Sequence, residues 1–430
     1  MNIGNLFIQS LNLKSLELPI DSKRQSQRCL LDYLGVVLGG KRYLFDRYQE
    51  IVDIKPNDAF LYGYAAHVLE LDDGHRHGMI HLGASIISAL LDVARIEHLS
   101  SEQLLRGIIM GYEAAVRCSV AIQPGHKLRG YHVSGTCGTI GSAMGIAFAL
   151  GYNKTQLKST LACAVTSAAG LLEIQEQSSE LKPFNVARAA MDGVVAAQIG
   201  RLGLPGPDDI LGGKRGFLAA LTDTPHEEAL TSFGEGFAIE GIYQKVHAAC
   251  RHCHPAIDAT LAIRNDIGLH PDQVERIEVH TYKLAVGSHD HTDIKGISSA
   301  KLSTPYSVAL AVVKGCAGYA DYNEDNLNDY WIKNLTRKVS IIEDEELTQR
   351  SPGVRGAKVD IYLKNGQSFE ASCYYPKGEP ENPLSQQELD DKFRGLAMYG
   401  GLSSEDCDEV INEIWKDDMD LNRIMNIVCK

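Results

Sequence analysis

The sequence GYHVSGTCGTIGSAMGIAFAL, residues 130–150, is a long apolar segment in which glycine and alanine recur at helical intervals. Small residues such as Gly138, Gly141 and Gly145 allow another helix backbone to approach closely. A helix that is apolar on all sides is expected in the interior of a protein. Together with a second small-residue segment, TLACAVTSAAG at residues 160–170, it predicts a central, fully buried pair of helices.

Helical periodicity extends on both sides of this segment, from residue 1 to about residue 235. Ser100 and Gln103 form a capping box ahead of apolar residues at helical spacing, which predicts an amphipathic helix. Another helix is predicted over residues 185–202, where Gly203 and Pro205 end it.

The pattern changes near residue 240. A predicted helix over 255–267 is followed by alternating apolar residues at 277–281 and 339–341, which indicate short strands. Asn365-Gly366 separates two further alternating runs, a pattern typical of a hairpin with a two-residue type I′ turn. From Ser385, which forms a second capping box with Glu388, the sequence is helical again.

These patterns predict a mainly α protein with an α+β second domain. We expect a large helical domain built from residues 1–239, a smaller α+β domain over residues 240–388, and C-terminal helices over residues 389–430 that return to the first domain. A chain of 430 residues is long enough for two such domains.

Composition limits the class of function. Lys and Arg number 42 against 55 Asp and Glu, and this net charge of −13 argues against a nucleic-acid partner. No stretch reaches the roughly 18 apolar residues of a membrane span, and no secretory signal is visible. We therefore expect a soluble, cytoplasmic protein without a membrane partner, whose ten cysteines are reduced. Motifs of nucleotide-binding loops and α/β-hydrolases are absent.

Cys250-Arg251-His252-Cys253-His254 has the form of a c-type haem attachment site, but such sites belong to exported proteins. His247, Cys250, Cys253 and His254 also have the residue types of a zinc site, although structural zinc sites usually draw a second ligand pair from elsewhere in the chain. The alternative is a polar loop before a helix that begins at Pro255. We predict no metal here.

Three polar segments are candidates for chemistry. HVLELDDGHRHGMIH, residues 67–81, combines carboxylates with four imidazoles, which suits acid–base catalysis or metal binding, and it should line a cleft or lie on the surface. Residues 130–136 put hydroxyl and N–H groups at a helix N-terminus, which favours an anionic ligand. Lys182 precedes another helix. A polar helix end, a helix cap and a solvated lysine are the structural alternatives.

Five segments, taken in order, resemble the conserved blocks of the MmgE/PrpD family. They are ELDDGHRHGMIHLGAS (70–85), GYHVSGTCGTIGSA (130–143), LKPFNVARAAMDG (181–193), KVHAACRHCHPAIDA (245–259) and STPYSVALA (303–311). Activities in this family include 2-methylcitrate dehydratase, cis-aconitate decarboxylase and iminodisuccinate epimerase. The resemblance covers nearly the whole chain, and it implies a large all-helical domain with a smaller α+β lid domain, usually in a homodimer.

By this resemblance, the active site lies between the helical domain and the lid, and it uses no metal or organic cofactor. His81 and His132 are the implied proton-transfer residues, and Lys182 and Lys245 are the implied clamps for substrate carboxylates. The remaining candidates are Asp72, which would orient an imidazole or lysine, Tyr306 on the lid side, and the substrate-binding residues Glu70, Asp73, Arg76, Ser134 and Thr136.

The chain departs from the family pattern at three places. Glu70-Leu71-Asp72-Asp73-Gly74 stands where many members have D-F-D-D-[ST], and Leu82 replaces the proline after the catalytic-type histidine. Phe184-Asn185 follows the K-P pair in place of Leu or Met and then His. Lost or added polar groups change which substrate atoms are paired, so the substrate is not carried over.

The resulting expectation is a cofactor-independent enzyme that abstracts a proton α to a carboxylate of a small di- or tricarboxylic acid. Loss of water, as in a 2-methylcitrate dehydratase-like hydro-lyase, is the favoured outcome. An epimerase or isomerase of the iminodisuccinate type and a decarboxylase of the cis-aconitate type are the alternatives within the class. A metal-binding or structural protein is the alternative outside it.

Overall fold

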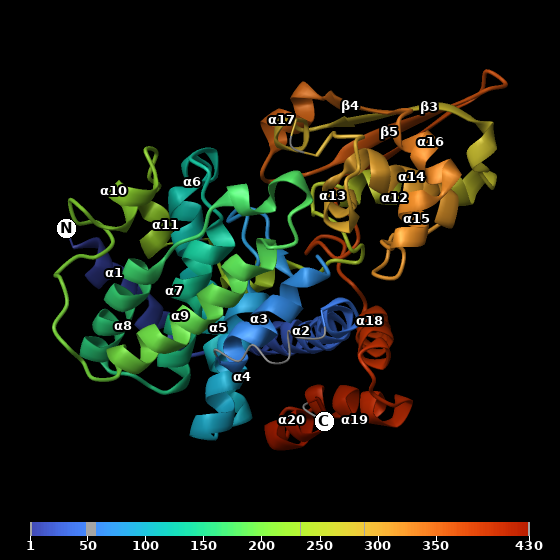
Figure 1. The fold of residues 1–430 in the computed structure, drawn as a ribbon. Helices are drawn as coiled ribbons and strands as arrows, with labels where there is room; N and C mark the ends of the chain where they lie inside the picture. The colour runs from blue at the N-terminus through green and yellow to red at the C-terminus, as the bar shows by residue number, and fades with distance from the viewer. Residues whose placement is uncertain (1, 49–56, 233, 288, 429–430) are drawn as a thin grey trace.

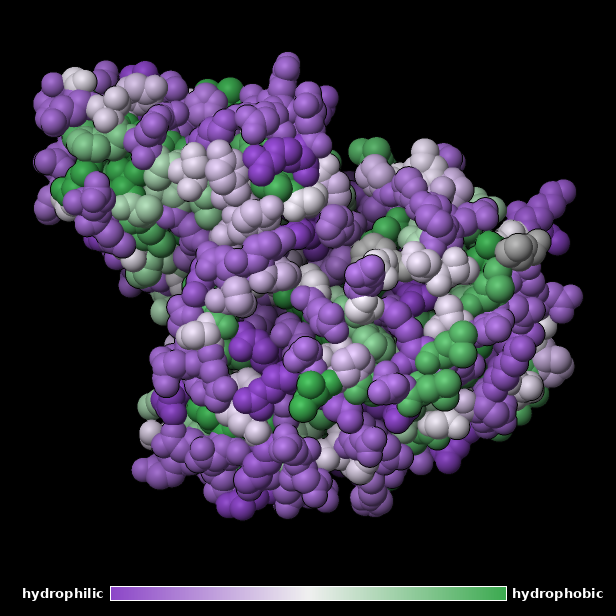
Figure 2. Space-filling model, turned by 180° about the vertical axis from the view of Figure 1, so that it is seen from behind, coloured by the Kyte–Doolittle hydropathy of each residue, from purple (hydrophilic) through white to green (hydrophobic). Residues whose placement is uncertain are grey.

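The computed structural model describes residues 2–48, 57–232, 234–287 and 289–428. The protein is mainly helical with a small mixed sheet, which confirms the predicted fold class. A helical part and an α+β part lie side by side (Figure 1), and in the view from behind a notch separates their upper edges (Figure 2). Among the described residues, no helix is both long and apolar enough to cross a bilayer.

The first part of the chain is built almost entirely of helices. They are α1 (Ile3–Ser15), α2 (Ile20–Arg47), α3 (Asp58–Val68), α4 (Gly83–Glu97), α5 (Ser101–Ile122), α6 (Gly125–Leu128), α7 (Val133–Ala149), α8 (Lys154–Ser167), α9 (Lys182–Gly200), α10 (Phe217–Leu221) and α11 (Glu228–Thr231). The capping box of Ser100 and Gln103 at the start of α5 is present as predicted.

Helix α7 is central to this part, and all of its residues are buried, as the sequence predicts. A Cβ atom added at Gly145 would lie 2.8 Å from the carbonyl oxygen of Gly107 in α5, so glycine is required where the two helices meet. The predicted pair is right in part: α7 packs against α8, but more extensively against α5 and α9. Helix α8 is not fully buried, because polar residues such as Lys154 and Lys158 occupy its outer face.

The second part combines helices with a four-stranded sheet. Its helices are α12 (His254–Ile267), α13 (Ile297–Leu302), α14 (Thr304–Lys314), α15 (Glu324–Asn328), α16 (Tyr330–Thr336) and α17 (Glu345–Arg350). The strand order is β4 (Val339–Glu343), β3 (Val274–Thr281), β5 (Ala357–Leu363) and β6 (Ser368–Cys373), with only the β3–β4 pair parallel. Alternate residues of β3 and β5 share an apolar core with α12 and α14, which lie beneath the sheet in Figure 1.

The predicted hairpin is formed by β5 and β6, but its predicted turn type is wrong. A type I′ turn needs positive φ at both central residues. Gly366 has φ of 87°, whereas Glu70, Met79 and His98 are the only described non-glycine residues with positive φ. The amide of Gly366 instead donates to the carbonyl of Leu363, as in a type I turn followed by a glycine bulge.

The C-terminal helices α18 (Gln386–Tyr399), α19 (Ser404–Ile414) and α20 (Leu421–Val428) share the apolar core of the first part, and α18 lies against α2. Apart from a few residues of α2, α18 and the chain after α3, the other core is built from residues 248–373. The chain passes between the cores beside a small sheet that the sequence did not predict, β1 (Gly74–His75) with β2 (Ile242–Tyr243). We propose the domain limits 1–239 with 389–430, and 240–388, on this basis.

Candidate active site

A cleft of about 680 Å³ lies where the helical part meets the α+β part. Four cationic side chains line it: Lys127 and Lys182 from the helical part, and Arg251 and Arg355 from the α+β part. None of the described residues that line the cleft is Asp or Glu. Behind the lining, Lys182 pairs with Glu70 and Arg251 with Glu379, whereas Lys127 and Arg355 have no carboxylate within ion-pair distance among the described residues. The cleft therefore attracts anions although the whole chain is negatively charged.

His81 lines the cleft, and its ring is held from behind by two acceptors. Its Nδ1 lies 2.9 Å from the carbonyl oxygen of Asp73 and 3.3 Å from Oδ2 of Asp72. The same Asp72 oxygen lies 2.7 Å from Nδ1 of His67. Burial, with smaller contributions from Lys245, His67 and Lys182, lowers the pKa of His81 to about 3 although Asp72 raises it. The imidazole of His81 is therefore neutral at pH 7.

His132 lines the cleft at the N-terminus of α7. Nδ2 of Asn185 lies 3.1 Å from Nδ1 of His132 and 3.1 Å from the carbonyl oxygen of Leu171. Burial, and then the charge of Lys182, lowers the pKa of His132 well below its usual value. Asn185 is thus the residue that orients this imidazole, at the position where the family pattern usually has histidine.

Glu70 joins the two lysines that the sequence proposes as clamps. Its carboxylate forms ion pairs with Nζ of Lys182 and, at 3.1 Å, with Nζ of Lys245, which also donates to the Glu70 carbonyl oxygen at 3.0 Å. Burial raises the pKa of Glu70, but the two ammonium groups outweigh it and hold that pKa well below the usual value. Lys182 reaches the cleft, whereas Lys245 is fully buried behind it.

The comparisons with known proteins agree with the sequence pattern. Residues 53–229 match the MmgE/PrpD N-terminal domain, and residues 247–417 match the MmgE/PrpD C-terminal domain. The chain belongs to the MmgE/PrpD family. This confirms the resemblance on which the candidate residues were chosen.

Relatives of this MmgE/PrpD protein are similar along most of their length. A cis-aconitate decarboxylase-like protein, oryM, of Aspergillus oryzae is 24% identical over 96% of this chain and 94% of its own. Cis-aconitate decarboxylase of Mus musculus is 25% identical over 87% of this chain and 82% of its own. That of Aspergillus terreus is 24% identical over 76% of this chain and 71% of its own.

Several candidates lie outside the lining of the cleft. Arg76 forms ion pairs with Glu379 and Glu381 at the junction of the two parts. Thr136 is buried, and its Oγ1 lies 2.9 Å from Nε2 of His126. Tyr306 belongs to the α+β core and packs near Tyr322, because the first turn of α14 faces inward there.

Three further candidates lie behind the cleft and hold its wall. Ser134 accepts a hydrogen bond from the backbone of His81 at 3.0 Å. Asp72 and Asp73 hold the His81 ring from behind, as the two distances above show. Most of the segment 67–81 is buried, and within it Met79 and His81 line the cleft.

Sequence reasoning missed most of the cleft's positive charge. Lys127 and Arg355 stand in no recognisable motif, and Arg251 was noticed only as the spacer of a Cys-x-x-Cys pattern. Nη1 of Arg251 and Nε of Arg355 are buried and have no hydrogen-bond partner among the described residues. Donors in this state are what a carboxylate ligand would satisfy.

Two groups of side chains bring three possible metal ligands within 4.8 Å of one another near the cleft: His67 with Asp72 and His81, and Cys250 with His252 and His289. The second group draws its third member from residue 289, not from the local His247, Cys253 and His254 that the sequence offered. The lysines and arginines of the cleft oppose a divalent cation there. The nine described cysteines are all free, and Cys429 lies outside the described residues.

Asp73 has a structural role beneath the start of α4. Its Oδ1 accepts from the amide of Gly83 at 2.8 Å, and its Oδ2 accepts from the hydroxyl of Tyr112 at 2.6 Å. Burial raises the pKa of Asp73 to about 7, although these two hydrogen bonds lower it. Between an unfolded pKa of about 3.9 and this value, the folded protein binds the extra proton.

The free energy of unfolding should therefore fall as the pH rises from about 4 to 7, by on the order of 4 kcal/mol from this group. Asp73→Asn keeps the acceptor for Gly83, offers a donor to Tyr112 and does not titrate. We expect the variant to be more stable than the wild type at pH 8 and no more stable at pH 4, in urea unfolding at both values. Equal pH dependence in the two proteins would contradict this assignment.

Proposed function

We propose that this MmgE/PrpD protein is a lyase that removes a proton α to a carboxylate of a small di- or tricarboxylic acid. The observation that carries the proposal is the cleft itself, whose lining combines four cations with four imidazoles, among them His81 and His132, and has no Asp or Glu among the described residues. Cations bind the carboxylates and stabilise the enediolate-like charge that develops when the proton leaves.

The hydrogen bonds of His81 favour a role as the base. A carbonyl oxygen accepts and cannot donate, so the contact between Nδ1 of His81 and the Asp73 carbonyl places the ring proton on Nδ1. Nε2 then has the lone pair. A low pKa keeps this nitrogen unprotonated at neutral pH.

The hydrogen bonds of His132 favour the opposite role. The Leu171 carbonyl fixes the nitrogen of the Asn185 amide on its side, and that nitrogen also faces Nδ1 of His132. Because Nδ1 accepts, the ring proton is on Nε2. The neutral ring of His132 is thus a hydrogen-bond donor, through Nε2–H, toward a substrate oxygen on which negative charge develops.

Two reactions are candidates, one that begins with removal of the α-proton and one in which CO2 leaves in its place. Loss of water is the reaction favoured by the sequence: the proton that His81 takes from carbon is returned to the leaving oxygen, which departs as water while Nε2 of His132 donates a hydrogen bond to it. Loss of CO2 is the second candidate, favoured by the cis-aconitate decarboxylases among the relatives. In that case the carbanion left behind takes a proton that comes from water, and Nε2–H of His132 donates a hydrogen bond to a carboxylate of the substrate.

Incubation with a panel of hydroxy and unsaturated di- and tricarboxylic acids in deuterated water tests the proposal. A dehydratase would release water and yield an unsaturated acid, and a decarboxylase would release CO2 and place deuterium on the carbon that lost it. Deuterium entering the carbon skeleton without any loss would indicate an epimerase. If no acid of the panel is converted or exchanges a proton, the proposal is overturned.

A further inference from the structure

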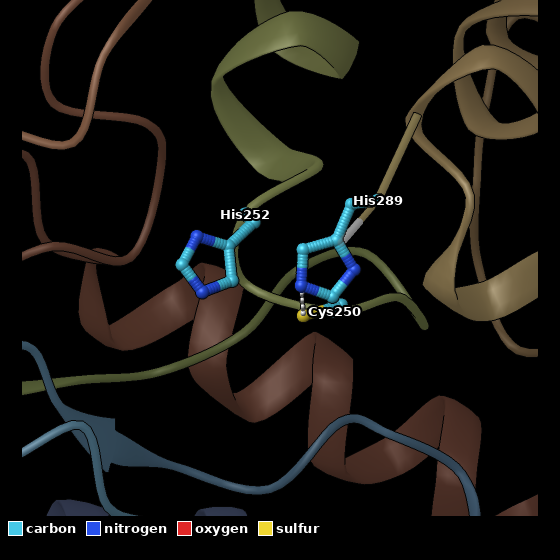
Figure 3. A group of neighbouring side chains, drawn as sticks. All are labelled: Cys250, His252 and His289. Carbon is cyan, nitrogen blue, oxygen red and sulfur yellow. Dashed lines mark hydrogen bonds between the residues drawn. The ribbon is translucent and has the colours of Figure 1, made fainter. Parts of the chain in front are cut away.

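The cleft contains a pair of side chains that the proposed reaction does not use. Sγ of Cys250 lies 3.7 Å from Nε2 of His289, and Figure 3 shows the two side chains facing each other. Nδ1 of His289 lies 2.8 Å from the carbonyl oxygen of Leu302, so Nδ1 is the donor and Nε2 faces the sulfur. The Cys250 thiol, the His289 imidazole that can act as its base, and the Leu302 carbonyl that orients this imidazole thus lie side by side in space.

A third side chain supports the ring of the base. His252 stacks on His289, with ring centroids 4.7 Å apart and an angle of 21° between the rings (Figure 3). Nδ1 of His252 lies 2.5 Å from the hydroxyl of Tyr282, which fixes that ring in turn. Burial, and then the charge of His289, lowers the pKa of His252 well below its usual value, so the stack holds one charge at most.

The charges around Cys250 favour a thiolate. Burial raises the pKa of Cys250, but the charge and hydrogen bond of His289, followed by the charge of Lys182, lower it to about 6. Burial lowers the pKa of His289, but Cys250 outweighs it and raises that pKa. Besides each other, the titratable groups that act on Cys250 or His289 are His252, Lys127, Lys182, Lys245, Glu70, Cys253 and Tyr282.

The charged groups around Cys250 also determine which electrophiles react with it. Lys127 and Arg355 line the cleft with Cys250 and have no acidic partner within ion-pair distance among the described residues. Nε of Arg355 and Nη1 of Arg251 are both buried without a hydrogen-bond partner there. These groups repel a divalent metal and attract a carboxylate.

We propose that Cys250 and His289 form a reactive thiolate–imidazolium pair, which is alkylated by electrophiles that carry a carboxylate. With iodoacetate, the sulfur forms a bond to carbon and iodide leaves with the electron pair. With an unsaturated dicarboxylate such as fumarate, the sulfur bonds to one alkene carbon, the π pair moves to the other, and that carbon takes the proton of His289. The product in both cases is a thioether, and no further reactant is needed.

Alkylation of the intact protein by iodoacetate, an anion, and by iodoacetamide, its neutral analogue, tests the proposal without any turnover. Peptide mass spectrometry gives the rate at each cysteine between pH 5 and 9. We expect Cys250 to react first, to prefer iodoacetate, and to reach half its maximal rate near pH 6. Exposed Cys316, whose pKa burial raises to about 11, is the internal control and should be slow with both reagents.

Variants separate the two parts of the proposal. His289→Gln should move the half-maximal pH toward that of a free thiol, about 8.5. Arg355→Gln should reduce the preference for iodoacetate at least several-fold and change the iodoacetamide rate less, and 0.5 M salt should act in the same direction.

Three results would overturn the proposal: labelling of Cys250 no faster than that of Cys316, no preference for the anionic reagent in the unaltered protein, or stoichiometric zinc that blocks labelling. The first two need no variant, so they decide the matter even if His289→Gln does not fold. Because alkylation is measured without substrate, its failure leaves the proposed lyase activity standing, and the reverse also holds.

Discussion

Replacing His81 by alanine is expected to lower kcat about 10²- to 10⁴-fold, which is the usual contribution of a positioned general base. The ring is neutral at pH 7, and its Nδ1 is held by Asp73 and Asp72, so Nε2 is the nitrogen available to take the proton. The variant should still bind the substrate, because the cations that line the cleft remain. Turnover and deuterium exchange at the α-carbon, measured on the same substrate, should fall together.

His226→Ala is the matched control, since that imidazole is half exposed at the surface and lies outside the cleft. It should leave kcat unchanged. Added imidazole should restore part of the His81→Ala activity if the ring acts as a base, whereas a merely structural role predicts no rescue. Near-normal exchange in His81→Ala would show that the base is another residue.

The sequence predicts an element of the fold correctly where a single segment contains all the residues that determine it. The small residues of α7 require burial whatever surrounds them, and the capping boxes at Ser100 and Ser385 are complete within four residues. The choice of α5 and α9 as partners of α7 was not readable, because it depends on Gly107 and on Gly193, which lie in other segments. The predicted type of the hairpin turn is wrong for a similar reason. Asn365-Gly366 is compatible with two turn types, and the register of the two strands selects one of them.

The candidate site was readable in part for the same physical reason. His81, His132 and Lys182 stand in recognisable blocks, and all three line one cleft. Lys127 stands in the short helix α6 and Arg355 in a loop, neither of them in a recognisable motif, and only the three-dimensional fold brings them to that cleft. Conversely, Tyr306 stands in a matching block, but its side chain belongs to the core of the α+β part. A matching sequence block shows where a residue lies along the chain, but it does not show which way its side chain points.

Glu70→Gln is expected to lower the free energy of unfolding by about 3–5 kcal/mol, the usual cost of removing one partner from a buried ion pair. Lys245 is fully buried, and apart from Glu70 its nearest carboxylate is Asp72, at 4.0 Å from Nζ. Since Glu70 has a depressed pKa, the difference between wild type and variant should be present above pH 4.5 and shrink as the pH falls below it.

Urea unfolding of four proteins separates charge from packing in this cluster. Glu70→Gln combined with Lys245→Met should recover most of the loss, because a neutral pair of similar volume leaves no buried charge without its partner. Asp46→Asn, which breaks the exposed pair with Arg42, should cost less than about 1 kcal/mol. If the double variant is as unstable as Glu70→Gln alone, the loss does not come from the unpaired charge of Lys245, and this account of the cluster is wrong.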